Sequence, residues 1–259
     1  MKPRARDHAK AKVASKMFGR MSQDERIVRG VLGVRATDVP DRLLVVATEN
    51  FSKGATSRLK NVKVKGRLAT GKYSDTTIGV LDTGIGSPAA IIFLEATAKT
   101  NPQVFIRADF CGGLSSDHDI GHAFIADSVL VGDGAGSAYF GAGKKIAADS
   151  TLTKDVYAIS TNSGLPTHRG TMWTTDVLLR QTEELLQEWV GKGAHAVDME
   201  TSAILGIASE NKIPAASINC ISDLQLHRKP LFGPEIDPML LRGIDLVIDA
   251  AIQALVEWK

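Results

Sequence analysis

The chain has 259 residues, of which 44% are hydrophobic and 23% are charged, as is ordinary for a soluble globular protein. This composition excludes a mainly disordered chain, a collagen-like chain and a mini-protein held together by disulfides. The net charge of +2 predicts no nucleic-acid partner. No apolar run approaches the roughly 20 residues of a membrane span, so we expect no membrane association. Two cysteines beside a large core predict a cytoplasmic protein.

The first 31 residues differ from the rest and predict a basic N-terminal arm preceding one domain over residues 32–259. The first 20 residues contain seven lysines or arginines and a single acidic residue, Asp7. We interpret this segment as a solvated or oligomer-contacting arm. An organelle-targeting segment and an anion-binding segment are the alternatives.

After the arm, apolar runs predict strands that alternate with helices. The predicted strands are 43–47, 78–81, 104–107, 123–130, 196–200 and 215–221. The predicted helices are 89–96, 174–191, 201–211 and 238–258. This alternation predicts an α/β fold, as a single domain with a central mixed sheet flanked by helices. In such folds the ligand crevice lies outside the carboxyl ends of the strands.

Two glycine-containing clusters follow predicted strands. Residues 83–87 (TGIGS) lie between a strand and a helix, where backbone N–H groups can face an anion. A plain structural turn explains this pattern equally well. In the second cluster, Arg107 is followed by Cys111, Gly112 and Gly113. An arginine at the end of a strand can hold a phosphate or a ribose oxygen, and a surface ion pair is the alternative.

The third cluster combines two carboxyl groups. Glu200 begins a predicted helix, where it could accept hydrogen bonds from a sugar diol or simply favour the helix dipole. Asp223 follows Ser222 at the end of a buried strand. A partly desolvated carboxyl group there would have a raised pKa and could protonate a leaving group. A turn or N-cap role is the alternative for Asp223.

The histidines show no metal-binding spacing. His118 and His122 are four residues apart, but the glutamate of an HExxH motif is missing. We therefore expect no metal site, and no Walker sequence or GxSxG elbow is present.

Taken together, in this order, these clusters resemble the nucleoside phosphorylase/nucleosidase family of the purine and uridine phosphorylase type. The resemblance covers roughly residues 41–259. The matching segments are 84–88 (GIGSP), 106–107 with 111–114, 170–176 (GTMWTTD), 197–201 (VDMET) and 221–223 (ISD).

The resemblance implies a single α/β domain whose mixed sheet curls partly into a barrel. It also implies a homo-oligomer, either a dimer or a trimer of dimers. The implied reaction is cleavage of the N-glycosidic bond of a nucleoside, by phosphate in phosphorylases and by water in nucleosidases. No organic cofactor is implied, and inorganic phosphate would be the co-substrate of a phosphorylase.

The resemblance also implies roles for individual residues. Asp223, oriented by Ser222, would be the general acid that protonates the purine, Glu200 would bind the ribose hydroxyls, and Met199 would pack under the sugar. The implied phosphate-binding residues are Arg107, Gly84 and Lys53. The implied positions beside the base are Phe110 and Leu178.

The sequence departs from the phosphorylase pattern at two places. The usual Gly-Asp-Pro-x-Arg phosphate loop is replaced by residues 47–53, in which Lys53 is the only substitute for the arginine. Asp109 and Phe110 replace a Gly-Ser pair, which places a negative charge near the expected phosphate and removes a hydroxyl. Glu49 lies near the place of the water-activating acid of hydrolytic relatives.

Three functions therefore remain open. Phosphorolysis of a purine nucleoside is our first hypothesis. The alternative is a hydrolytic nucleosidase that acts on a nucleoside or on a nucleotide such as AMP, and in the second case Arg228 or Lys229 would hold the 5′-phosphate. The third is a nucleoside-binding family member with little catalysis.

Overall fold

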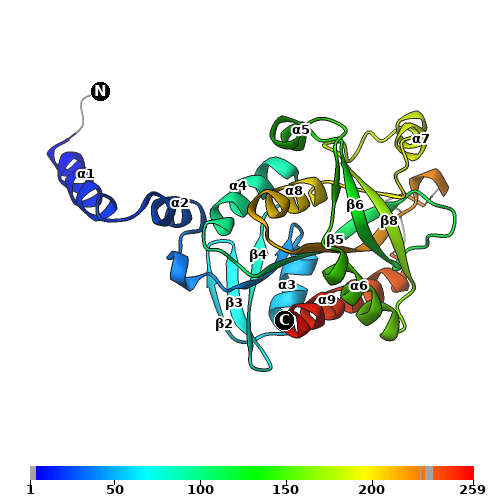
Figure 1. The fold of residues 1–259 in the computed structure, drawn as a ribbon, viewed down its shortest axis with the longest axis horizontal. Helices are drawn as coiled ribbons and strands as arrows, with labels where there is room; N and C mark the ends of the chain where they lie inside the picture. The colour runs from blue at the N-terminus through cyan, green and yellow to red at the C-terminus, as the bar shows by residue number, and fades with distance from the viewer. Residues whose placement is uncertain (1–3, 228, 231–235) are drawn as a thin grey trace.

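The computed structural model describes residues 4–227, 229–230 and 236–259. Its strands form one mixed sheet with helices on both faces (Figure 1). The strands are β1 (Arg42–Val46), β2 (Lys60–Lys65), β3 (Leu68–Tyr73), β4 (Thr76–Asp82), β5 (Val104–Gly113), β6 (Ala123–Val131), β7 (Lys145–Ala147), β8 (Thr167–Thr174), β9 (Ala196–Asp198) and β10 (Ala215–Asp223). The α/β prediction is confirmed.

Part of the sheet closes on itself. The order β10-β6-β8-β9-β5-β1-β4-β3-β2 contains a further pairing of β10 with β5, so that β5, β9, β8, β6 and β10 form a closed ring. Strands β1, β4, β5 and β10 run parallel to their neighbours in this region, so their carboxyl ends meet at one edge of the sheet. This partial barrel is the architecture that the resemblance implied.

Helices bury the two faces of the sheet. The helices are α1 (Ala5–Phe18), α2 (Gln23–Leu32), α3 (Glu49–Ser57), α4 (Ser87–Ala98), α5 (Gly134–Phe140), α6 (Ser150–Asn162), α7 (Glu183–Gly191), α8 (Thr201–Asn211) and α9 (Pro238–Glu257), with short 3₁₀ turns η1 (Ala36–Asp38) and η2 (Gln225–His227). Figure 1 shows α4 and α8 on one side of the sheet and α3, α6 and α9 on the other.

Strand β1 illustrates how the sequence produces two cores. Its side chains alternate between the faces of the sheet. Leu43 and Val45 pack in the cluster that includes α4 and α8, whereas Leu44 and Val46 pack in the cluster that includes α9. All four are almost completely buried, so both faces of this strand are covered. A continuous apolar run is the expected pattern for such a strand.

The N-terminal arm consists of two helices with different surroundings. Helix α1 extends away from the body (Figure 1). Helix α2 lies against the body because Val28 and Leu32 are buried in its core, and Gly33 ends the helix with a positive φ of 71°. The predicted boundary between residues 31 and 32 therefore falls inside α2.

Two predicted elements differ from the structure by more than two residues at one end. The strand predicted over residues 104–107 continues to Gly113, so Arg107 lies within β5 rather than at its end. The helix predicted from residue 174 begins only at Glu183, because Thr174 is the last residue of β8 and Thr182 caps α7. Within the described residues, no helix is both long and apolar enough to cross a membrane.

Candidate active site

A cavity of about 250 Å³ opens where the carboxyl ends of β1, β5 and β10 meet β9 and the start of α8. This volume is near the lower end of the range for small-molecule sites, about 300–1,000 Å³. Most of the cavity wall is apolar, but four carboxyl groups and one guanidinium group also line it. Such a combination is typical of a site that binds a small polar molecule in a defined orientation.

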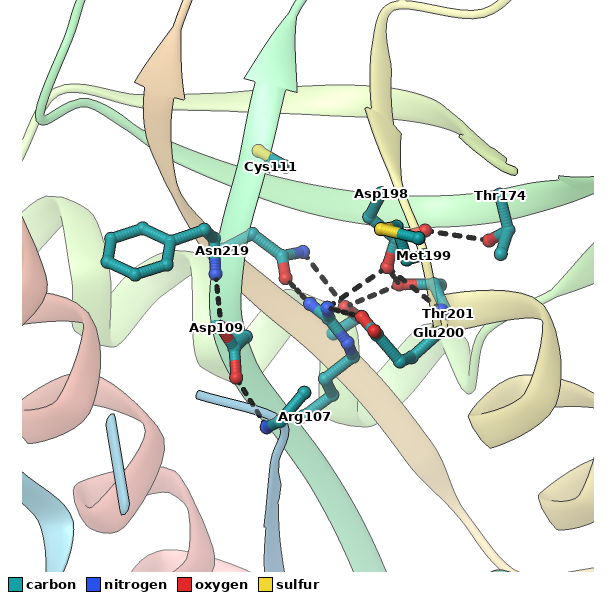
Figure 2. Close-up of polar contacts among 12 residues, drawn as sticks. Arg107, Asp109, Cys111, Thr174, Asp198, Met199, Glu200, Thr201 and Asn219 are labelled. Atoms are coloured by element: carbon teal, nitrogen blue, oxygen red, sulfur yellow. Dashed lines mark hydrogen bonds and ion pairs between the residues drawn. The ribbon is translucent and has the colours of Figure 1, made fainter. Parts of the chain in front are cut away.

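Arg107 is the cation of this cavity, and three polar side chains hold it in place (Figure 2). Its Nη2 lies 2.6 Å from Glu200 Oε2 and 3.2 Å from Asp198 Oδ2, and its Nη1 donates to Asn219 Oδ1. Only 2% of the arginine is exposed. Burial lowers the pKa of Arg107, but the charges of Asp198 and Glu200 outweigh burial and raise that pKa above its ordinary value. The guanidinium therefore stays charged.

Glu200 bridges Arg107 and the glycine turn before α4. Its Oε1 accepts the backbone N–H of Gly86 at 2.6 Å, and its Oε2 accepts Arg107. Burial raises the pKa of Glu200, Arg107 lowers it, and the neighbouring Asp198 raises it, with a net upward shift. Each carboxylate oxygen has two acceptor positions, so Glu200 can still accept hydroxyl groups from a ligand.

Asp198 supports the side chains around Arg107 by accepting hydrogen bonds from two threonines. Its Oδ1 accepts the hydroxyl of Thr174 at 2.7 Å, and its Oδ2 accepts the N–H and the hydroxyl of Thr201 at 2.9 and 2.5 Å. These bonds fix the turn between β9 and α8, so they position Glu200 against Arg107. Figure 2 shows this group of side chains around the guanidinium.

Asp109 belongs to β5, and its carboxylate lies at the carboxyl end of β1. Its Oδ2 accepts the backbone N–H groups of Ala47 and Thr48 at 2.5 and 3.0 Å, and its Oδ1 accepts the Thr48 hydroxyl at 2.9 Å and the N–H of Phe110 at 2.9 Å. Exposed N–H groups of this kind form anion sites in proteins. Here the chain's own carboxylate fills the position.

Asp223 lies elsewhere on the cavity wall, at the end of β10. Its Oδ1 is 2.7 Å from Ser222 Oγ, and its Oδ2 is 3.3 Å from Gln225 Nε2. The residue is 5% exposed. Burial raises the pKa of Asp223, and the two hydrogen bonds only partly oppose this effect. A carboxyl group with a raised pKa beside a cavity has the properties of a proton donor.

The apolar part of the wall comes from separate segments. Phe110, Leu178 and Met199 line the cavity, and Ile85 lies beside it with 58% of its surface exposed. Phe110 also packs edge-to-face on Phe51, with ring centroids 5.0 Å apart. An apolar wall opposite polar groups suits a ligand that has one flat apolar part and one hydroxylated part.

A family model described as "Phosphorylase superfamily" matches residues 36–232. The chain belongs to the phosphorylase superfamily. A purine nucleoside phosphorylase (DeoD-type) of Bacillus cereus is 28% identical over 193 residues, covering 73% of this chain and 82% of that protein. Members of this superfamily are phosphorylases or nucleosidases. Membership therefore indicates that this chain is an enzyme that acts on N-glycosidic bonds.

Two solved structures show the same fold. A uridine phosphorylase from Vibrio fischeri superposes with a TM-score of 0.77 at 23% identity, covering 87% of this chain and 95% of that one. An AMP nucleosidase from Bacteroides thetaiotaomicron gives a TM-score of 0.73 at 17% identity, covering 90% and 96%. At these identities the likeness concerns the fold.

The structure of this phosphorylase-superfamily chain brings most of the predicted site residues together. Asp223, Ser222, Glu200, Met199, Arg107, Phe110 and Leu178 all line the cavity. Gly84 does not line it, and its N–H donates to Asp82. Gly86, two residues later, is the glycine of this turn that contacts Glu200.

Lys53 and Glu49 lie outside the cavity, in contrast to their predicted roles. They are four residues apart on the exposed face of α3 and form an ion pair of 2.5 Å, with 77% and 75% of their side chains exposed. Arg228, a candidate for holding a 5′-phosphate, lies outside the described residues. Lys229 is half-exposed and contacts Asp119 at 2.6 Å, and it does not line the cavity.

Sequence reasoning assigned no role to five residues that line the site or hold Arg107, namely Asp198, Gln225, Gln181, Asn219 and Thr48. Gln225 donates both to Asp223 and to Gln181, whose side-chain oxygen is 2.9 Å away. Gln225 lies two residues after Asp223, and this short spacing is the one signal that could have indicated the contact. Gln181 is 44 residues from Gln225, and no local pattern reveals that pairing.

Proposed function

We propose that this chain hydrolyses the N-glycosidic bond of an uncharged nucleoside, with a purine as the leaving base. The observation that carries the choice of water over phosphate is the position of Asp109. Its carboxylate accepts two backbone N–H groups and one hydroxyl at the end of β1, where an anion would otherwise be bound. This geometry reverses the order of the two hypotheses drawn from sequence.

The charge of the cavity supports the same conclusion. Among the described residues that line it, Arg107 faces four carboxyl groups, those of Asp109, Asp198, Glu200 and Asp223. Arg107 is itself held by Asp198 and Glu200. Like charges in a low-dielectric site repel strongly, so a phosphate ion would enter this cavity at a substantial energetic cost. An uncharged nucleoside avoids that repulsion.

The proposed mechanism uses Asp223 and Glu200. Protonated Asp223 donates its proton to a nitrogen of the base, which leaves with the electron pair of the broken C–N bond. The sugar then carries positive charge, and nearby carboxylates stabilise it. Glu200 accepts the ribose hydroxyls. Water adds its oxygen to the anomeric carbon, and the proton that this water releases replaces the one lost by Asp223.

Ser222 orients the proton donor in this mechanism. Its hydroxyl has one hydrogen, which it can donate either to the backbone oxygen of Cys111, 3.2 Å away, or to Oδ1 of Asp223, 2.7 Å away. When Asp223 is protonated on Oδ1, Ser222 can accept from it and donate to Cys111. In this arrangement Ser222 keeps a hydrogen bond to the protonated carboxyl group and fixes its orientation. Cys111 takes no part as a nucleophile, because burial raises the pKa of its thiol well above the ordinary value.

Release of free base from adenosine, inosine, guanosine, uridine and AMP, with and without phosphate, tests the proposal. We expect release from a purine nucleoside without phosphate, with free ribose as the second product. Release that requires phosphate and forms ribose 1-phosphate would overturn it. No release from any of these would favour the nucleoside-binding alternative.

Phosphorolysis remains the second candidate, because the Bacillus cereus relative is named a purine nucleoside phosphorylase and because Arg107 lies on the cavity wall. A homo-oligomer, a cytoplasmic location and the absence of a cofactor remain predictions. Gel filtration with light scattering tests the first of these.

A further inference from the structure

Three of the six histidines of the chain gather at the beginning of β6 and β8. His122 directly precedes β6, His168 is the second residue of β8, and His118 lies in the connection between β5 and β6. The ring centroids of His118 and His168 are 4.6 Å apart, and those of His122 and His168 are 5.2 Å apart. None of the three lines the cavity described above.

We propose that Asp117, His118 and His168 bind one divalent transition-metal ion, for which Zn²⁺ is the best fit. One ligand atom from each of these residues lies within 4.8 Å of the others. Histidine nitrogens with a carboxylate oxygen form the usual three-ligand zinc site, in which water takes the fourth position. Mg²⁺ and Ca²⁺ fit poorly, because they prefer oxygen ligands.

One pair of the proposed ligand atoms already has the separation that a bound ion requires. His168 Nδ1 lies 3.4 Å from Asp117 Oδ2. Two ligand atoms on one tetrahedral zinc ion, each about 2.1 Å from the metal, are about 3.4 Å apart. The two separations that involve His118 are within 4.8 Å, and His118 lies in a connection outside the regular strands.

His118 also has a buried nitrogen that lacks a partner. Its Nδ1 forms no hydrogen bond within the described residues, although the residue is only 7% exposed. A buried polar atom without a partner is rare in folded proteins and requires an explanation. Coordination of an ion by this nitrogen would supply the missing partner.

His122 provides the support that metal-binding histidines usually have. Its Nδ1 lies 3.0 Å from His168 Nε2, the nitrogen that does not face Asp117. A histidine that binds a metal through one nitrogen commonly donates a hydrogen bond through the other, which fixes the orientation of the ring. His168 can therefore bind through Nδ1 and donate from Nε2 to His122.

The proposed metal site lies behind the wall that carries Asp223. Successive residues of a strand face opposite sides. A Cβ on Gly112 would meet Asp223 Oδ2 at 3.1 Å, whereas a Cβ on Gly113 would meet His118 Nδ1 at 2.9 Å. The backbone N–H of Ile221 also donates to the carbonyl of His122. A bound ion would thus hold the connection between β5 and β6 against the beginning of β8, next to the end of β10.

The test uses the full-length protein after dialysis against a chelator, titrated with Zn²⁺ in a calorimeter and followed by thermal unfolding. We expect one ion per chain and a rise in Tm of about 5–10 °C at a free Zn²⁺ concentration near 100 times Kd. Co²⁺ should give the ligand-field absorption of a tetrahedral site. Absence of saturable 1:1 binding would overturn the proposal.

Two variants locate the site. Asp117→Asn is expected to fold normally because 72% of this side chain is exposed, and His168→Gln retains a hydrogen-bonding side chain beside His122. Each should weaken Zn²⁺ binding by at least about 10-fold. His8→Gln is the matched control, because His8 is exposed on α1 away from this cluster. Unchanged affinity in both site variants would contradict the assignment.

Discussion

Asp109 and Thr48, 61 residues apart in the chain, are joined by two hydrogen bonds, so that the Asp109 carboxylate occupies a position that could bind an anion. The carboxylate accepts the backbone N–H of Thr48 at 3.0 Å and its hydroxyl at 2.9 Å. The N–H of Ala47 completes the set at 2.5 Å. Because an internal carboxylate satisfies these donors, they are not available to a phosphate ion, and this relationship underlies the proposal of hydrolysis.

Asp109→Ser should open this anion site. The substitution removes the carboxylate and frees the N–H groups of Ala47 and Thr48 beside Arg107. We expect phosphate to bind the variant and inhibit or redirect base release, while the parent protein is insensitive to phosphate over the same range. Isothermal titration with phosphate measures the difference. Asp155→Ser, a substitution on the outer face of α6, serves as the control. If the parent and Asp109→Ser bind phosphate equally, Asp109 does not block the site.

Asp223→Asn should abolish most of the turnover while leaving substrate affinity almost unchanged. The amide has nearly the same size as the carboxyl group, but it cannot supply the proton that the leaving base needs. Loss of a general acid typically lowers kcat by about 100-fold or more. Steady-state kinetics and equilibrium binding of the nucleoside separate the two effects. Retained turnover would contradict the assigned role of Asp223.

The pH dependence of base release should follow the protonation of Asp223. Burial raises the pKa of this carboxyl group, so its protonated form persists to higher pH than in an ordinary aspartate. Activity is therefore expected to be highest below this raised pKa and to fall as the pH increases through it. The residual activity of Asp223→Asn should lack this descending limb. The same descending limb in the variant would assign it to another group.

The stability of the fold should also depend on the ionisation of Asp223, and it should decrease in the same direction of pH as the activity does. The proton on Asp223 is bound more tightly in the folded state than in the unfolded state. This contribution to stability is present below the unfolded pKa and is lost as the pH rises through the folded pKa. The Tm of Asp223→Asn should therefore be higher than that of the parent at neutral pH and equal to it at acid pH. Equal Tm differences at both pH values would contradict the upward shift.

The sequence predicted elements best where the apolar pattern is continuous. Strands β1, β6 and β10 are buried on both faces and were predicted from their apolar runs. Strand β2 was missed because every one of its residues is exposed and three of the six are lysines. It pairs with β3 through hydrogen bonds between main-chain atoms, which leave little trace in composition.

The site residues also divide into those that the local sequence predicts and those that depend on the folded structure. Glu200 and Asp223 were predicted because both follow apolar runs that place them at the ends of strands. Glu49 and Lys53 follow β1 in the same way, yet the helix α3 turns both towards solvent. Asp109 was predicted only as a negative charge near the expected phosphate. Its bonds to Ala47 and Thr48 depend on the pairing of β1 with β5, which requires the folded structure.

Glu200→Ala should weaken binding of ribosides more than of 2′-deoxyribosides. The charged acceptor is lost, and with it the hydrogen bond to the 2′-hydroxyl, which 2′-deoxyribosides do not form. A hydrogen bond to a charged group contributes about 1.5–3 kcal/mol, so KM for ribosides should rise about 10-fold or more. Parallel KM measurements on adenosine and 2′-deoxyadenosine test this. Equal increases for the two substrates would contradict the placement of the ribose at Glu200.

Removal of the Arg107 charge should destabilise the fold strongly. Arg107→Met leaves Asp198 and Glu200 buried without their counter-charge, which in comparable cases costs about 3–5 kcal/mol. The matched control is Lys53→Met, which breaks an exposed ion pair with Glu49 and should change stability by less than about 1 kcal/mol. Urea unfolding compares the two. Similar effects from both variants would contradict the central position of Arg107.

The most direct test of hydrolysis is base release from a purine nucleoside by the purified, phosphate-free protein, with the sugar product identified by mass spectrometry in ¹⁸O-labelled water. Hydrolysis should give free ribose that carries one ¹⁸O atom at the anomeric position, formed at a rate that added phosphate does not increase. Because free ribose exchanges this oxygen, the product must be trapped as it forms. Ribose 1-phosphate as the product, with no turnover until phosphate is added, would contradict hydrolysis.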